Sequence, residues 1–202
     1  GGGIITELVP DEQEDFRTEA RERDSAWVKG DVGAEDRAER YGHRAAVILL
    51  TGPDTTAKGF LARKLETVLV AEGRHAYLLA AENLQRGLDA DLQDTRPEEM
   101  VRRFGEVARL LTDTGSLVIT TTNAFQQATK DIVQTVQTLV NPTPVITIHM
   151  TKDQAGPQPD VDLIFAGPED FDACTHQIVE TLKLKGILAE LSGSQPAFQF
   201  SI

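Results

Sequence analysis

The sequence predicts an α/β domain in which a mainly parallel sheet of about five strands lies between helices on both faces. Two observations predict this three-layer sandwich. Short apolar runs rich in β-branched residues recur along the chain, and segments of helical composition separate them. Because the runs are apolar almost throughout, they are typical of parallel strands that are buried on both faces.

The expected strands follow one another at intervals that leave room for a helix or a loop. Gly115 directly precedes the third strand, which fits the use of glycine just after the end of a helix. The expected strands are residues 45–51, 75–80, 116–122, 144–150 and 161–165.

Four segments carry helical composition. The second begins with Pro97, Glu98 and Glu99, and proline followed by carboxylates suits a first helical turn. One connection lacks a helix, because TKDQAGPQPD at 151–160 lies where a parallel crossover normally contains one. An extended return is feasible there, since ten extended residues reach about 33 Å. The expected helices are residues 58–72, 97–114, 126–140 and 169–185.

The composition indicates a globular protein and argues against several classes of partner. The chain has 202 residues, 40% of them hydrophobic, which is enough for a substantial core. No apolar run reaches eighteen residues and no secretory signal is evident. A single cysteine, Cys174, excludes an internal disulfide framework, and a net charge of −12 disfavours binding to nucleic acid or anionic lipid. We expect a cytoplasmic protein with no nucleic-acid or membrane partner.

Composition also divides the chain into three parts. Residues 1–44 are dense in charged side chains and predict an N-terminal extension or linker. Residues 45–190 carry all the expected strands and helices and form the predicted domain. Residues 191–202 are expected to be a C-terminal tail.

The stretch LLTGPDTTAKGF at 49–60 joins the first strand to the first helix, as a phosphate-binding loop would. Such a loop reads G-x-x-x-x-G-K-[ST], and Gly52 and Lys58 fit it. Ala57 replaces the second glycine, and Gly59 stands where the magnesium-binding hydroxyl belongs. The candidate phosphate-binding residues are Gly52, Thr55, Thr56 and Lys58.

Asp54 is the least suitable residue for phosphate in this loop. Its carboxylate would face the phosphate, and like charges about 4 Å apart repel by about 1 kcal/mol in bulk water and about 4 kcal/mol at an effective dielectric constant of about 20. The loop is therefore expected either to hold no nucleotide or to bind a smaller ligand through the hydroxyls of Thr55 and Thr56.

Several motifs in order make residues 27–188 resemble the adenylylsulfate (APS) kinase family. DRAERYGHRAAVILLTG at 36–52 resembles the family's lead-in R-x-x-x-x-G-H-[RK]-[GA], and EGRHAYLLAAENLQRGL at 72–88 resembles its DGDNVRHGL loop. RPEEMVRRFGEVARLLTDTG at 96–115 resembles the helix that contains NIRR, and HQIVETLKLKGIL at 176–188 resembles the closing helix. The first five residues, GGGII, are similar to the last barrel strand of the GTPase subunit of ATP sulfurylase, which in some bacteria is fused ahead of APS kinase.

The resemblance implies which residues would meet the substrates. In this family the loop amides, the loop lysine and Mg²⁺ hold the phosphates of ATP, and the 3′-hydroxyl of APS attacks the γ-phosphate to give PAPS. Glu82 matches the carboxylate that in the family is placed to accept the proton of that hydroxyl or to hold metal, so it is the candidate catalytic residue. The candidate substrate-binding residues are Asn83, Arg86, Arg102 and Arg103.

The sequence departs from the family at several of these positions. Ala80 replaces the first aspartate of DGDN, and Gln85 replaces an arginine that meets the substrate. The third-strand exit holds Phe125, whose alignment with the family's aromatic residue is open. Residues 151–160 replace the long lid with its KGLY segment, and lids of this kind exclude water during transfer.

These departures favour a catalytically inactive domain that keeps a regulatory, nucleotide-binding or assembly role in sulfate activation. One alternative is an active APS kinase that uses Lys58, Glu82 and the arginine pair. Another is a P-loop kinase relative that acts on a different substrate, or a purely structural oligomerisation module. We assign no metal ligand and no certain cofactor, and ATP and Mg²⁺ are expected only if the domain is active. Expected partners are a nucleotide (ATP, APS or PAPS), ATP sulfurylase and further copies of the chain.

Overall fold

The computed structural model describes residues 27–28, 30–92, 97–123, 129–151, 161–167 and 170–189. The chain divides into two units, Gly1–Asp31 and Val32–Ile202, and the elements named below all belong to the second. Most of the N-terminal extension, the expected C-terminal tail, the lid replacement at 152–160 and Phe125 lie outside the described residues.

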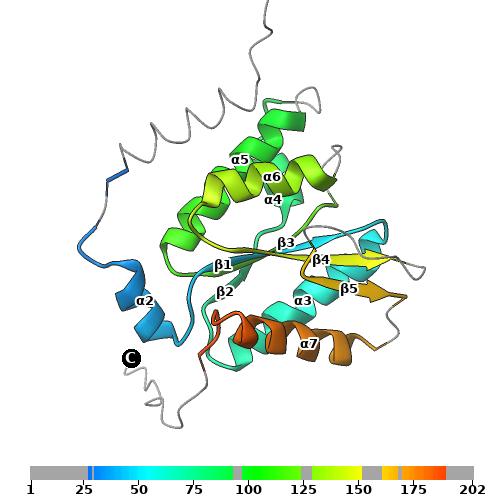
Figure 1. The fold of residues 1–202 in the computed structure, drawn as a ribbon. Coiled ribbons are helices and arrows are strands. Elements are labelled where there is room, and N and C mark those ends of the chain that lie inside the picture. Colours follow the sequence, from blue (N-terminus) through cyan, green and yellow to red (C-terminus); the bar gives the residue numbers. More distant parts are fainter. Residues whose placement is uncertain are drawn as a thin grey trace, which may run out of the picture. The chain divides into compact units, whose positions relative to one another are not determined.

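A five-stranded sheet forms the centre of the second unit (Figure 1). Its strand order is β2-β3-β1-β4-β5, and every pair of neighbours is parallel. The three middle strands are flanked on both sides by other strands and are largely buried, as expected for parallel strands covered on both faces. The strands are β1 (Ala46–Thr51), β2 (Ala76–Leu78), β3 (Leu117–Thr121), β4 (Val145–Thr151) and β5 (Leu163–Ala166).

Helices cover both faces of this sheet, which confirms the predicted three-layer arrangement. On one face, α3 (Thr55–Ala71) and α7 (Phe171–Leu184) enclose a cluster that includes Ile48 and Leu50 of β1. On the other face, α5 (Pro97–Asp113) and α6 (Thr129–Val140) pack over Val47. Figure 1 shows α5 and α6 above the sheet and α3 and α7 below it. Successive side chains of β1 point to opposite faces of the sheet, so alternate residues pack into two separate hydrophobic cores.

Three differences from the expected elements have local causes. Helix α3 begins three residues before residue 58, because Asp54 caps it at Thr55. A short helix, α4 (Ala81–Gln85), occupies the loop that carries Glu82. Helix α2 (Ala34–Tyr41) precedes β1 and buries none of its residues, in keeping with its charged sequence.

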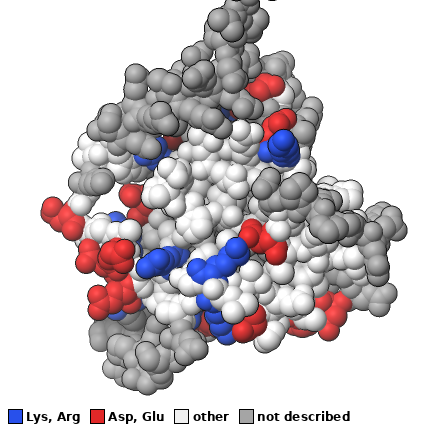
Figure 2. All heavy atoms as spheres, in the orientation of Figure 1, with Lys and Arg blue, Asp and Glu red and all other residues white. Residues whose placement is uncertain are grey.

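The surface near α2 is acidic. Glu35 and Asp36 lie in its first turn, and Figure 2 shows acidic side chains gathered at the left of the view, where Figure 1 places α2. Among the described residues, no helix has the length and apolar character that crossing a membrane would require.

Candidate functional site

The candidate site lies at the carboxyl ends of the central strands, where parallel α/β sheets usually bind ligands. The loop from Gly52 to Asp54 leaves β1 and leads into α3. Thr122 follows β3, and His149 lies near the end of β4. The fold thus brings residues distant in the sequence to one edge of the sheet.

Gly52 has a structural reason to be glycine. Its φ is +109°, a backbone conformation that side-chain-bearing residues rarely adopt. A Cβ added there would lie 1.9 Å from the carbonyl oxygen of Met150 in the neighbouring strand. The glycine that matches the phosphate-loop pattern is therefore required by the packing of the loop against β4, whatever the loop binds.

Asp54 is the N-cap of α3. Its Oδ1 accepts a hydrogen bond of 2.9 Å from the amide of Ala57, and its own carbonyl accepts one from the amide of Lys58. Carboxylates favour this place because the first-turn amides lack partners and carry the positive end of the helix dipole. The carboxylate expected to repel phosphate thus already takes one of the amides that a phosphate would use.

Lys58 is turned into the protein. Its side chain is 2% exposed, and its Nζ donates hydrogen bonds to the carbonyl oxygen of Gly52 (2.5 Å) and to Oγ1 of Thr122 (3.2 Å). Burial lowers the pKa of this ammonium, and the nearby charge of Asp54 partly offsets the effect. The ammonium of Lys58 is therefore hydrogen-bonded to oxygens of the protein itself, and the carboxylate of Asp54 partly balances its charge.

His149 is a member of this cluster that sequence reasoning missed. Its Nδ1 lies 3.0 Å from Oγ1 of Thr51, and the two residues are paired between β4 and β1. Burial lowers its pKa, and the charge of Lys58 lowers it further. A histidine at the carboxyl end of an otherwise apolar run was the available signal.

Gly59 leaves space where the loop pattern expects a hydroxyl. A Cβ at this position would meet Nη1 of Arg63 at 3.5 Å and Nδ2 of Asn123 at 4.0 Å, which are ordinary contacts. Asn123 itself donates to the carbonyl oxygen of Thr55 at 3.0 Å. A small hydroxyl side chain would therefore fit at position 59, although the chain does not provide one.

The residues present do not fit the Mg²⁺ ion that this type of loop holds. Such a loop binds the ion through the hydroxyl that follows its lysine, and Gly59 has none. Within the described part of the chain, no three His, Cys, Asp or Glu side chains are grouped closely enough to hold a metal ion.

The other predicted site residues are less enclosed. Thr55 and Thr56 are exposed in the first turn of α3. Glu82 is half-buried in the first turn of α4, and Asn83 and Arg86 are exposed. The two hydrogen bonds of Nζ of Lys58 end on Gly52 and Thr122, so they do not join the lysine to this second group.

Arg102 and Arg103 of α5 are engaged by carboxylates of the same chain. Arg102 binds both carboxylate oxygens of Glu99 at 2.7 and 2.8 Å, and Nε of Arg103 binds Glu99 at 2.9 Å. Arg103 also forms a two-point pair with Asp91 at 2.7 and 3.0 Å. Nη1 of Arg103 lies 3.8 Å from the buried carboxylate of Asp89. Glu106 also lies 3.6 Å from Nη1 of Arg102, so an anionic substrate would have to compete with four carboxylates for this pair of arginines.

Glu99 gives this arrangement a measurable pH dependence. Hydrogen bonds from Arg102, and then those from Arg103, lower its pKa from 4.5 to about 2. A lowered pKa in the folded state adds stability above the unfolded pKa, and that stability is lost as the pH falls from about 4.5 to about 2. We expect Glu99→Gln to lower the free energy of unfolding at pH 7 by about 1–2 kcal/mol, since solvent screens part of the interaction.

Urea unfolding at several pH values measures this effect. Between pH 4.5 and 2, the free energy of unfolding of the variant should fall less steeply than that of wild type. The difference in free energy of unfolding between the two proteins should therefore shrink as the pH falls. Glu98→Gln, at a neighbouring exposed position, is the matched control. A difference that stays constant over this pH range would show that Glu99 acts by packing alone.

Comparison with known proteins gives matches that agree on one family. Residues 44–158 match a family model described as adenylylsulphate kinase. An adenylyl-sulfate kinase of Aeromonas hydrophila subsp. hydrophila is 38% identical over 110 residues, which are 54% of this chain and 56% of that protein. The bifunctional enzyme NodQ of Rhizobium sp. (strain N33) is 41% identical over 95 residues, which are 46% of this chain and 15% of that enzyme.

A solved structure agrees with these matches at the level of the fold. The APS kinase of Mycobacterium tuberculosis aligns with a TM-score of 0.58 at 24% identity, covering 69% of this chain and 99% of that one. The match to the Aeromonas relative, in contrast, spans little more than half of that protein's length.

Proposed function

Because this chain belongs to the adenylylsulphate kinase family, we propose that it is a member that has lost phosphoryl transfer and serves sulfate activation in a regulatory, nucleotide-binding or assembly role. The core of the family fold is intact, since both faces of the sheet are packed. The chemistry of the loop is altered, and the proposal rests on that contrast.

One observation carries the proposal: groups of the protein itself occupy the places of a bound phosphate. A carboxylate accepts from a first-turn amide of α3, and protein oxygens accept the hydrogen bonds of the loop lysine. Asp54 accepts from the first turn of α3 at 2.9 Å, and Lys58 is buried on Gly52 and Thr122. In a working loop the backbone amides and the lysine hold the phosphates. A nucleotide would have to displace the internal contacts and also approach the charge of Asp54, which repels phosphate.

The position after Lys58 supports the same conclusion. Gly59 offers no oxygen to a metal ion, so Mg²⁺ would lose its anchor in the loop. Loss of the ion matters for phosphoryl transfer because the metal neutralises charge that develops on the phosphate oxygens. We assign no catalytic step to this loop.

The residues proposed to meet any ligand remain those of the sequence prediction. A nucleotide phosphate would meet the loop, and an adenylyl-sulfate group would meet α4 and the start of α5. The proposed set is Gly52, Thr55, Thr56, Lys58, Glu82, Asn83, Arg86, Arg102 and Arg103. Its proposed ligands are ATP, APS or PAPS.

The proposed setting is the cytoplasm, with ATP sulfurylase and further copies of the chain as partners. The similarity to part of a bifunctional enzyme supports a role within a larger assembly. We also propose the three-part division of the chain, with residues 1–44 as a charged N-terminal extension or linker, 45–190 as the kinase-like domain and 191–202 as a tail.

A second candidate function is an active APS kinase. It is favoured by the position of Lys58 in the first turn of α3, which matches the loop pattern, and by Glu82 at the start of α4. In this case Lys58 would turn out of the loop to meet phosphate, and Glu82 would accept the proton of the attacking hydroxyl.

Calorimetric titration separates these functions. ATP, ADP, APS and PAPS are each titrated into the whole chain with and without Mg²⁺. The proposal expects no Mg²⁺-dependent binding of ATP, and binding of APS or PAPS without metal would identify an effector site. Tight ATP binding that needs Mg²⁺ and disappears in Lys58→Ala would instead support the active kinase.

A further inference from the structure

Residues 42–44, which lead into β1, are joined to residues 187–189, which follow α7. His43 and Leu188 form an isolated antiparallel bridge. The amide of Arg44 donates to Ile187 at 2.8 Å, and the amide of Ala189 donates to Gly42 at 3.0 Å. The two segments, far apart in the sequence, thus form a two-stranded junction at the amino end of β1.

Arg74, in the connection between α3 and β2, reinforces this junction. Its side chain is 4% exposed, and its guanidinium donates to the carbonyl oxygen of Gly42 and, at 2.9 Å, to that of Ala189. One buried cation therefore bridges both segments. Each acceptor is a neutral carbonyl, so the charge of Arg74 is not cancelled within the junction.

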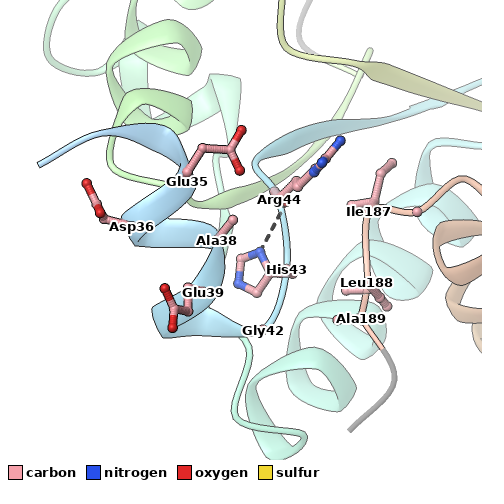
Figure 3. Close-up of a pocket in the computed structure, with 11 residues that line it drawn as sticks. Glu35, Asp36, Ala38, Glu39, Gly42, His43, Arg44, Ile187, Leu188 and Ala189 are labelled. Atoms are coloured by element: carbon pink, nitrogen blue, oxygen red, sulfur yellow. Dashed lines mark hydrogen bonds between the residues drawn. The ribbon is translucent and has the colours of Figure 1, made fainter. Parts of the chain in front are cut away.

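His43 lies at the centre with both ring nitrogens in use. Its side chain is 2% exposed. Nδ1 lies 3.2 Å from the carbonyl oxygen of Arg44, the contact drawn in Figure 3, and Nε2 lies 2.9 Å from the amide nitrogen of His75. A carbonyl can only accept and an amide can only donate, so Nδ1 carries the hydrogen and Nε2 does not.

This arrangement admits only one neutral tautomer of His43. A second proton would have to sit on Nε2, which faces the amide hydrogen of His75, and the two donors would repel each other. Burial lowers the pKa of His43, the hydrogen bond to Arg44 raises it, and the charges of Arg74 and His75 lower it further. The ring of Tyr41 also packs against His43, with centroids 5.8 Å apart.

The charged and titratable groups around the junction come from every element packed on it. Helix α2 contributes a carboxylate and a tyrosine, and the segment before β1 contributes an arginine. The connection from α3 to β2 contributes a carboxylate, an arginine and a histidine, and α7 contributes a lysine near Arg74. These groups are Glu39, Tyr41, Arg44, Glu72, Arg74, His75 and Lys183.

We propose that His43 is a proton-sensitive clip: its neutral ring holds residues 42–44, whose backbone pairs with residues 187–189, against the start of β2, and protonation of Nε2 releases the contact with His75. Release of this contact would change the shape of a surface pocket of about 450 Å³. Both segments line this pocket, together with Glu35, Asp36 and Glu39 of α2. Figure 3 shows His43 and Arg44 between α2, which carries Glu35, Asp36 and Glu39, and the segment with Ile187, Leu188 and Ala189. Opening the clip would displace residues 42–44, which form part of the lining of this pocket.

Because the closed clip requires a neutral His43 ring, lowering the pH should favour opening. In the open state His43 titrates near 6.5, whereas the closed state resists the proton. The clip is therefore fully closed above about pH 6.5, and its opening equilibrium should rise by up to about tenfold per pH unit below that value. This inference does not depend on whether the phosphate loop is active.

Hydrogen exchange of the whole chain, followed by NMR between pH 8 and pH 5, tests the clip. The probes are the amides of Arg44, His75 and Ala189, and protection factors remove the pH dependence of intrinsic exchange. We expect their protection to fall by up to about tenfold per unit below pH 6.5, while amides in the middle of β1 and β3 keep theirs. The ¹⁵N shifts of the His43 ring should report hydrogen on Nδ1 alone at pH 8.

Three variants test whether His43 itself causes the pH dependence of amide protection. His43→Gln should lower the protection of the same amides and remove its pH dependence, with the sheet amides reporting that the domain is folded. His176→Gln, at an exposed position on α7, should behave as wild type. His75→Gln keeps the backbone donor and should retain the pH dependence. The proposal is overturned if protection does not change with pH, if the dependence survives in His43→Gln, or if it is lost in His75→Gln.

Discussion

Gly52→Ala is expected to lower the free energy of unfolding by about 3 kcal/mol or more. The new Cβ would lie 1.9 Å from the carbonyl oxygen of Met150, and this atom belongs to the backbone of β4, which cannot rotate away. The positive φ of +109° adds strain of its own. Together these effects require either β4 or the loop to shift, which overpacked interiors resist.

Denaturant unfolding followed by circular dichroism measures this loss, and Gly186→Ala is its matched control. Gly186 also has a positive φ, of +67°, but no atom lies within 4 Å of an added Cβ. Its substitution should cost only the backbone strain, about 1–2 kcal/mol. Equal losses in the two variants would mean that the contact with Met150 does not constrain Gly52.

Restoring the loop pattern should produce the largest gain in nucleotide binding. The triple variant Asp54→Ser, Ala57→Gly and Gly59→Ser replaces the carboxylate, returns the second glycine and supplies the missing hydroxyl. Serine at position 54 can still cap α3, and a Cβ at position 59 has room, with its nearest neighbour at 3.5 Å. Removing a like charge about 4 Å from phosphate relieves about 4 kcal/mol at an effective dielectric constant of about 20.

Calorimetry with ATP and Mg²⁺ should then show a gain of at least about 100-fold over the wild-type chain. The control variant carries Gly59→Ala in place of Gly59→Ser, so it has the same Cβ without the oxygen. It should bind ATP with little response to Mg²⁺, whereas the triple variant should depend on the ion. If the triple variant binds no better than wild type, the altered residues are not what prevents binding.

The sequence predicted the layers of the fold well because they depend on local patterns. The continuous apolar runs located all five strands, and Gly115 and Pro97 marked the ends of neighbouring helices. The start of α3 was placed too late, since Asp54 was interpreted as a residue facing phosphate and not as a helix cap. Capping depends on one side-chain rotamer, which a residue pattern does not specify.

The site was predicted less completely for a related reason. The pattern placed Lys58 correctly at the first turn of α3, but its bonds to Gly52 and Thr122 involve a residue 64 positions away. The neighbourhood of His149 likewise arises only when β4 pairs with β1. For Arg102 and Arg103, the helix was predictable from its local pattern, while the carboxylates that engage them include Asp91 in a separate segment. Whether these residues also meet a substrate stays a prediction.

Transfer of ³²P from [γ-³²P]ATP to APS by the whole chain in the presence of Mg²⁺ tests directly whether this domain has lost phosphoryl transfer. We expect no labelled PAPS above the level given by the Lys58→Ala variant, while an active APS kinase assayed in parallel labels its substrate fully. Clear turnover by the wild-type chain that Lys58→Ala abolishes would show instead that the chain is an active kinase.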